Sequence, residues 1–172
     1  DIVYLGNSNP KMEGGFGFNI RYGKHFSVNS FFNFRYGNKI VNYARMYAEN
    51  MYSNDNQMAS VNWRWRKDGD VTEIPRALYQ MGYNWLGSDR FVEDGSFLRF
   101  KQLTFNYTFD HMQLRNIGLN QLSLYFTLNN IITFTKYTGV DPEVGYNAQG
   151  VCADYNKTPR SKYFTLGVTV GF

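Results

Sequence analysis

The residues best suited to binding chemistry lie together in one short segment. Trp63 and Trp65 alternate with Arg64 and Arg66. Indole rings can stack on a sugar or a peptide, and a guanidinium group above an aromatic ring adds a cation–π attraction. The segment is therefore a candidate ligand contact, although the same side chains could simply pack the loop that carries them.

Three acidic residues follow this segment at spacings that loosely resemble a calcium-binding loop. Asp68, Asp70 and Glu73 lie within six residues of one another. Their order does not match the D-x-[DN]-x-[DN]-G pattern of a full calcium loop. We therefore expect a solvated turn here rather than a metal site.

A second group of candidates lies toward the end of the chain. Asp141 and Glu143 flank a proline and could contact a substrate or bind an ion, but we favour a role in holding their loop through backbone hydrogen bonds. Tyr137 and Tyr146 lie near them in sequence. Tyrosine is enriched where a membrane meets water, so an interfacial role is favoured over ligand contact.

The sequence offers no residues for catalysis. It contains no G-x-S-x-G, H-E-x-x-H or P-loop pattern. Its two histidines and its single cysteine, Cys152, are too few for a typical structural zinc site. The net charge of +4 is spread along the chain without a long basic run, which argues against nucleic acid. We predict no enzyme activity, no cofactor and no bound metal.

The composition indicates which elements position these candidates. The chain of 172 residues contains 15 Phe, 14 Tyr and 16 Gly, and its longest unbroken apolar run has only four residues. A membrane-spanning helix needs about 20 apolar residues, so a helical membrane protein is excluded. Aromatic residues on alternating segments punctuated by glycine favour β-strands instead.

The clearest alternation lies at the end of the chain. Every second residue is apolar, while threonine and glycine occupy the positions between. Alternate side chains of a strand point to opposite faces, so one face is large and apolar and the other is small and weakly polar. The apolar positions are Phe164, Leu166, Val168, Val170 and Phe172.

Similar alternation predicts five strands, at residues 15–22, 27–36, 96–109, 121–132 and 161–172. Within 96–109 the pattern changes phase: Leu98 and Phe100 are apolar in the first half, and Leu103 begins the apolar set of the second half. An extra residue in one strand shifts the face of all that follow. We therefore expect a β-bulge there, or a strand that leaves the apolar layer.

The connections alternate between short and long. Residues 23–25 and 110–120 form short turns, whereas the loops at 37–95 and 133–160 are long, and a helix is expected at 41–58. Short turns on the periplasmic side and long extracellular loops are typical of a transmembrane antiparallel β-barrel. Five strands cannot close a barrel, so we expect the C-terminal part of a larger protein.

Five segments carry a further pattern: YLGNSNPKMEGGFGFNIRYG, WRWRKDGDVTEIPRA, RFVEDGSFLRFKQLTFNYTF, NNIITFTKYTGVDPEVG and FTLGVTVGF. Taken in this order, they resemble the SusC-like TonB-dependent transporters of the Bacteroidetes outer membrane. The resemblance covers nearly the whole chain. It implies a plugged barrel of about 22 strands, of which residues 1–172 form the C-terminal portion.

The resemblance also implies a function and partners. It implies TonB-energised import of oligosaccharides or oligopeptides across the bacterial outer membrane, with a SusD-like surface lipoprotein as a hinged lid. Residues 63–66 are then candidate lid contacts as well. The last strand, ending at Phe172, would be recognised during membrane assembly, so deletion of Phe172 should reduce insertion. A passive porin and a soluble surface-binding β-domain remain the alternatives.

Overall fold

The computed structural model describes residues 2–82, 87–110, 114 and 118–172, and it divides into two compact units. We call them the sheet unit and the loop unit. The sheet unit comprises Lys11–Tyr36, Ser96–Lys136 and Arg160–Phe172. The loop unit comprises Asp1–Pro10, Gly37–Gly95 and Tyr137–Pro159.

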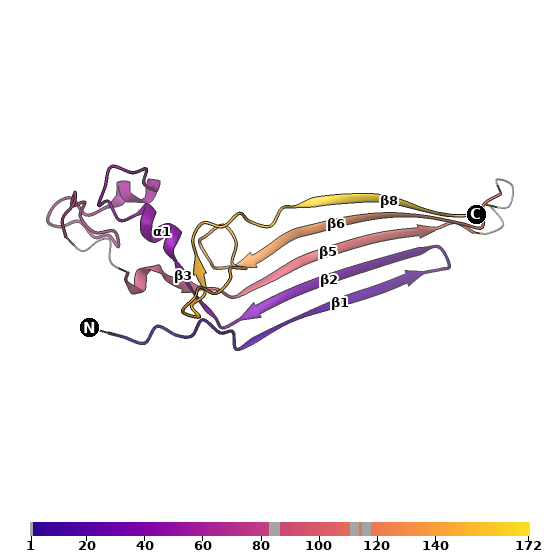
Figure 1. The fold of residues 1–172 in the computed structure, drawn as a ribbon, viewed down its shortest axis with the longest axis horizontal. Helices are drawn as coiled ribbons and strands as arrows, with labels where there is room; N and C mark the ends of the chain where they lie inside the picture. Colours follow the sequence, from indigo (N-terminus) through magenta and orange to yellow (C-terminus); the bar gives the residue numbers. More distant parts are fainter. Residues whose placement is uncertain (1, 83–86, 111–113, 115–117) are drawn as a thin grey trace. The chain divides into compact units, whose positions relative to one another are not determined.

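The sheet unit is a five-stranded antiparallel meander with the order β1-β2-β5-β6-β8 (Figure 1). Its strands lie within three residues of the predicted ones, which confirms an all-β fold built from five alternating segments. The strands are β1 (Met12–Tyr22), β2 (Phe26–Tyr36), β5 (Phe97–Thr108), β6 (Gln121–Thr135) and β8 (Tyr163–Gly171).

Cross-strand pairing brings the apolar positions of the five strands into rows on one face of the sheet. One row runs through Ile20, Val28, Phe105, Phe126 and Leu166, each paired with the next. Neighbouring rows are also mainly apolar, with Ser30 as an exception between Phe18 and Leu103. They contain stacked rings, including Phe32 on Phe16 and on Phe100. Alternation in the sequence thus becomes one continuous apolar face, which we call the apolar face.

The opposite face is polar and hydrogen-bonded across the strands. The Thr104 and Thr127 hydroxyl groups lie 2.9 Å apart, and those of Thr108 and Ser123 lie 3.0 Å apart. Arg35 on β2 forms an ion pair with Glu13 on β1 at 3.3 Å. Residues that alternate with the apolar rows therefore bind one another, as expected for the inner side of a barrel wall.

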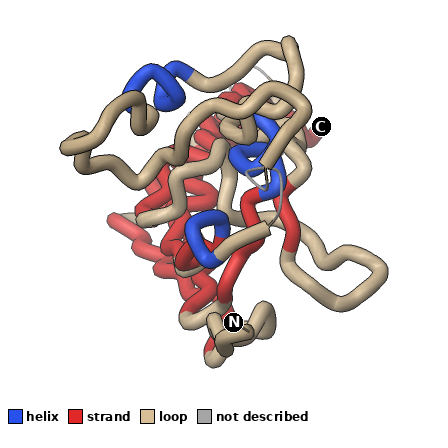
Figure 2. Tube along the Cα trace, turned by 90° about the vertical axis from the view of Figure 1, so that its left-hand side faces the viewer, coloured by secondary structure: helices blue, strands red, loops and turns tan. Residues whose placement is uncertain are grey.

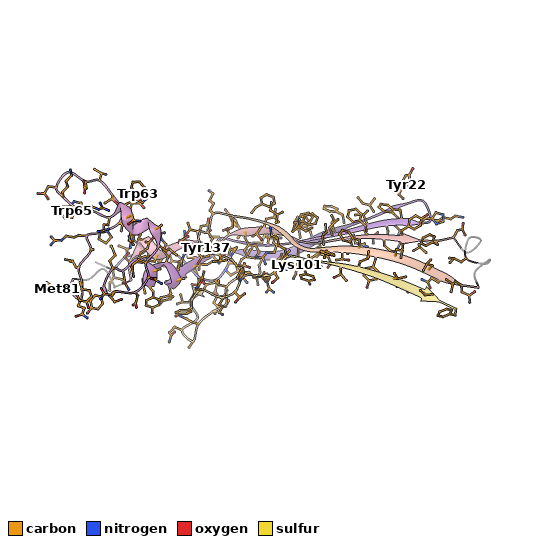
Figure 3. The ribbon with its side chains drawn as sticks, turned by 90° about the horizontal axis from the view of Figure 1, so that it is seen from above. Tyr22, Trp63, Trp65, Met81, Lys101 and Tyr137 are labelled. Carbon is orange, nitrogen blue, oxygen red and sulfur yellow. The ribbon has the colours of Figure 1, made fainter. Side chains whose placement is uncertain are left out.

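The predicted bulge is present. The register of β5 against β2 shifts at Lys101, where Phe31 pairs with Gln102 and Phe32 pairs with Phe100 (Lys101 is labelled in Figure 3). The extra residue lets Phe100 stay in an apolar row after the phase of the alternation has changed. It also places Arg99 on the polar face, where its Nε donates a hydrogen bond to Thr133 at 3.0 Å.

The ends of the sheet differ as the loop lengths predict. Tyr22 and Phe26 pair beside the short turn, and the β5–β6 connection leaves from the same end. Most of the residues between Asp110 and Gly118 lie outside the described part of the chain. Both long connections leave from the opposite end, after Tyr36 and after Thr135.

The loop unit contains a second, small sheet that the sequence did not reveal. Its order is β4-β3-β7, formed by Val92–Asp94, Lys39–Asn42 and Ala153–Asp154, and β3 pairs with β7 in parallel. Ile40, Tyr137, Val144 and Cys152 form its buried core. This small core joins segments from both long loops, so the loops fold against each other rather than separately.

The helix expected at residues 41–58 is much shorter than predicted. The α-helix α1 covers only Tyr43–Ala48, and Asn42 Oδ1 caps it by accepting a hydrogen bond from Arg45 N at 2.9 Å. Residues 39–42 pair as β3, so they are unavailable for the helix. The loop unit also contains two 3-10 turns, η1 (Ala59–Trp63) and η2 (Asp89–Phe91) (Figure 2). None of these helices has the length and apolar character needed to cross a membrane.

Candidate functional site

The apolar face of the sheet unit is exposed, and its side chains have no covering partner within the described residues. Its side chains are exposed although they are large and apolar: Phe18 is 60% exposed, Leu166 72% and Leu124 39%. On the polar face of the same strands, Ser123 and Thr127 are only 7% and 8% exposed. A water-soluble sheet buries its apolar side, so this arrangement is inverted. Figure 3 shows side chains leaving the sheet on both sides.

The residues assigned to membrane assembly all belong to this surface or follow it. Phe164, Leu166, Val168 and Val170 lie on β8 and pair with apolar residues of β6. Phe172 follows the strand and is 89% exposed. The structure therefore groups them on one exposed apolar edge, and their role in assembly stays a prediction.

The tryptophan and arginine segment forms a loop whose charged side chains bind its own backbone. Arg64 Nη1 donates to Val61 O at 3.2 Å, and Arg66 Nη2 donates to Asn62 O at 2.9 Å. Trp63 remains 78% exposed, whereas Trp65 is half-buried (Figure 3). Of the four candidates, Trp63 is therefore the side chain best placed for an external partner.

The acidic turn after this segment is stabilised locally. Asp70 Oδ2 accepts hydrogen bonds from the backbone nitrogens of Arg66 and Lys67, at 2.9 and 3.1 Å. Gly69 has a φ of +95°, which only glycine adopts readily. Asp70 thus closes a turn, and within the described residues no group of three acidic, histidine or cysteine side chains is arranged to hold a metal ion.

Tyr137 does not occupy the exposed position expected for an interfacial or ligand-binding ring. It is 5% exposed and donates a hydrogen bond from its hydroxyl group to Asp154 Oδ2 at 2.6 Å. Burial, reinforced by this carboxylate, raises the pKa of Tyr137 well above its usual value. The expectation was wrong because sequence alone did not reveal the small sheet that covers the ring.

The other candidates of this loop are placed differently. Asp141 Oδ1 accepts a hydrogen bond from Glu143 N at 2.9 Å, so its carboxylate holds the turn around Pro142. Tyr146 is 47% exposed and pairs through its backbone with Cys152. Tyr146 can reach a partner, whereas Asp141 has a clear structural task.

A network of buried charges, which the sequence analysis missed, organises the loop unit. Glu49 is buried and contacts Arg45 Nε at 3.2 Å, Ser60 Oγ at 2.7 Å and Arg90 Nη2 at 3.5 Å. Burial lowers the pKa of Arg90. Burial also acts to lower the pKa of Arg45, but the carboxylates of Glu49 and Glu93 outweigh it, so the pKa of Arg45 is raised. Only the fold brings these residues together, because up to 45 positions separate them in the chain.

A second carboxylate extends this network to the other loop. Glu93 accepts hydrogen bonds from Asn42 Nδ2 at 3.0 Å and from the backbone nitrogen and hydroxyl group of Thr138, each at 2.8 Å. Arg45 Nη1 lies 3.4 Å from the same carboxylate. Glu93 therefore ties β4, α1 and residues 137–159 together.

Beside this network the loop unit has a cavity of about 490 Å³, which we call the α1 pocket. Segments that are distant in sequence line it: residues 42–49, 58–60, 138–140 and 154–156. Arg45, Glu49 and Asp154 provide charge, while Met58 and Val140 provide apolar surface. None of the predicted site residues lines the pocket.

No family model matches the chain, but curated relatives match along its whole length. The chain is 30% identical to TonB-dependent receptor P3 and 28% identical to TonB-dependent receptor P39, both of Formosa agariphila. It is 34% identical over 49% of its length to TonB-dependent receptor SusC of Bacteroides thetaiotaomicron. The chain spans only 17% of each of the two full-length matches.

Solved structures give the same result. The RagAB peptide importer in its closed-closed state superposes with a TM-score of 0.78 and 25% identity, covering 96% of this chain and 18% of that one. A second structure, of the RagAB peptide transporter, gives a TM-score of 0.79 at the same identity. The resemblance to SusC-like TonB-dependent receptors is thus confirmed in sequence and in fold.

Proposed function

We infer that this chain forms part of the wall and the outer loops of an outer-membrane nutrient importer, because it resembles the SusC-like TonB-dependent receptors along its whole length. The whole-length match to TonB-dependent receptors is the observation that carries this inference. The chain covers about a sixth of those receptors. In the proposed importer, the remaining strands, the plug and the contact with TonB belong to the rest of the protein.

The structure supports different roles for the two faces of the sheet and for the long loops. The apolar face contacts the hydrocarbon of the outer membrane, and the polar face lines the lumen or contacts the plug. Both long loops, at 37–95 and 133–160, leave the strands from the sheet end opposite the short turns, and we assign that end to the cell exterior. Residues 1–172 would then form the C-terminal part of the barrel.

The outer loops are the proposed contacts for substrate and lid. Trp63 and Tyr146 are exposed aromatic side chains in these loops and offer flat apolar surface to an oligosaccharide or an oligopeptide. The partner would be a SusD-like surface lipoprotein. Oligopeptides gain support from the RagAB structures, whose protein is named a peptide importer.

The alternative is a passive porin, which would need no energy. The two are separated by measuring uptake of labelled oligopeptides and oligosaccharides into cells that make the full-length protein, with TonB present or deleted. An importer loses uptake when TonB is deleted, whereas a porin retains it. Recovery of the full-length protein from membranes without detergent would contradict both and support a soluble surface-binding domain.

A further inference from the structure

The α1 pocket contains more negative than positive charge. Its lining carries one guanidinium group, of Arg45, and two carboxylates, of Glu49 and Asp154. Arg90 and Glu93 contact these lining residues from outside the pocket. The two glutamates share the two arginines, with each arginine pairing with Glu49 and Arg45 also pairing with Glu93. Within the described residues, no ion pair includes Asp154.

Asp154 is well held but not neutralised. Its side chain accepts hydrogen bonds from the Tyr137 hydroxyl group at 2.6 Å and from Asn156 N at 2.8 Å, and the residue is 4% exposed. Across residues 2–82, 87–110, 114 and 118–172, the ion pairs join other carboxylates. A buried carboxylate of this kind costs free energy unless a positive charge approaches it.

A second atom in the same pocket points to a missing donor. The Glu49 side chain is 2% exposed, and its Oε2 accepts no hydrogen bond within the described part of the chain. Arg90 Nη2 lies 3.5 Å from this oxygen. Buried carboxylate oxygens usually accept hydrogen bonds, so this oxygen can take a donor that enters the pocket.

The rest of the lining suits the stem of a long cationic side chain. Met58, Ala44 and Val140 give the pocket a mainly apolar wall. Lysine places its methylene groups along apolar surface and extends its ammonium group to polar partners. The volume of about 490 Å³ lies within the range of small-ligand sites and accommodates one such side chain.

We propose that the α1 pocket binds the primary ammonium group of a lysine side chain in an imported oligopeptide, with Asp154 as its counter-charge and Glu49 Oε2 as a further acceptor. This inference rests on the proposed function, because it assigns the substrate class of the outer loops. The ammonium group can donate three hydrogen bonds, which matches a pocket that offers carboxylate oxygens rather than donors.

The test measures the affinity of the purified full-length receptor, with its companion lipoprotein, for two pentapeptides with blocked ends. The peptides differ at one central position, which is lysine in one and norleucine in the other. We expect the lysine peptide to bind about tenfold more tightly, as one charge-assisted contact provides. Asp154→Asn should remove this preference, and Asp68→Asn, which neutralises an exposed turn residue outside the pocket, should retain it.

A second variant keeps the test decisive if Asp154→Asn does not fold. Val140→Phe narrows the pocket without altering charge, and it should weaken binding of the lysine peptide. Equal affinity for the two peptides, a preference that persists in Asp154→Asn, or binding of neither peptide would overturn the inference. If the lysine site fails this test but cells still take up other oligopeptides or oligosaccharides in a TonB-dependent way, the proposed function is retained. If no TonB-dependent uptake is found, the proposed function is refuted as well.

Discussion

A charge placed on the apolar face of β1 tests whether that face meets lipid. Phe18 is 60% exposed and lies in the central part of β1, between Met12 and Tyr22. The strand has 11 residues, and at about 3.3 Å per residue with a tilt of about 40° it rises about 25 Å. This height equals the apolar band of an outer-membrane barrel, and the proposed function therefore puts Phe18 near the middle of the hydrocarbon layer.

The expected cost follows from this depth. An arginine at the bilayer midplane on the lipid face costs about 2–4 kcal/mol, which corresponds to a decrease of about 30- to 700-fold in the folding equilibrium. Phe18→Ala is needed as a reference, because it removes the same ring contacts without adding charge. Asn19→Arg and Asn19→Ala form the matched pair of variants on the polar face, one residue away from Phe18. Asn19 is exposed, as Phe18 is.

The assay compares the urea midpoints of the full-length variants folded in phospholipid vesicles, together with the amount of each variant in isolated outer membranes. Phe18→Arg should be less stable than Phe18→Ala by the stated amount. Asn19→Arg and Asn19→Ala should differ by less than about 0.5 kcal/mol, as is usual for exposed sites. Equal penalties at the two positions would refute the assignment of the apolar face to lipid.

Three further outcomes are expected in the full-length protein. Gly17→Ala should destabilise it by about 1–3 kcal/mol in urea unfolding, because an added Cβ would overlap a backbone carbonyl oxygen of β2, whereas Gly14→Ala meets only a ring at ordinary contact distance and should be nearly neutral. Tyr137→Phe should cost about 1.5–3 kcal/mol by removing the hydrogen bond to Asp154. Because the pKa of Tyr137 is raised in the folded state, this contribution should stay constant in thermal unfolding from about pH 7 to 9 and decline only at pH values above the unfolded value of about 10. Phe172→Ser should lower the amount of protein in the outer membrane at unchanged total expression, and an unchanged amount would contradict its role in assembly.

The sheet unit was largely predictable, because its fold depends on a pattern with a period of two. The alternation within each strand predicts which of its residues lie on the apolar face, and the change of phase near Lys101 predicted the position of the bulge. The ends were less certain: β6 continues to Thr135, three residues beyond the predicted end. Pairing with β5 extends that strand, and such pairing is not visible in a single segment.

The loop unit was poorly predictable for the opposite reason. Its small sheet joins residues 39–42, 92–94 and 153–154, none of which is long enough to show alternation. Without that sheet, residues 41–42 look compatible with a helix, and Tyr137 looks exposed. The α1 pocket was equally invisible, since Glu49 and Asp154 lie more than 100 positions apart. Local composition finds exposed aromatic residues such as Trp63, but it does not find sites assembled from distant loops.

The exposure of the sheet residues bears directly on the choice between a membrane wall and a soluble sheet. In β6, Leu124 is about five times as exposed as Ser123 or Thr127, although leucine is by far the more apolar. A soluble sheet with this distribution would hide its hydroxyl groups and present rows of phenylalanine and leucine to water, which monomeric soluble proteins rarely do. Hydrocarbon removes the conflict, because it accepts the apolar rows while the inner hydroxyl groups bind one another. The inverted distribution is therefore the physical reason to expect a lipid neighbour, independent of any resemblance.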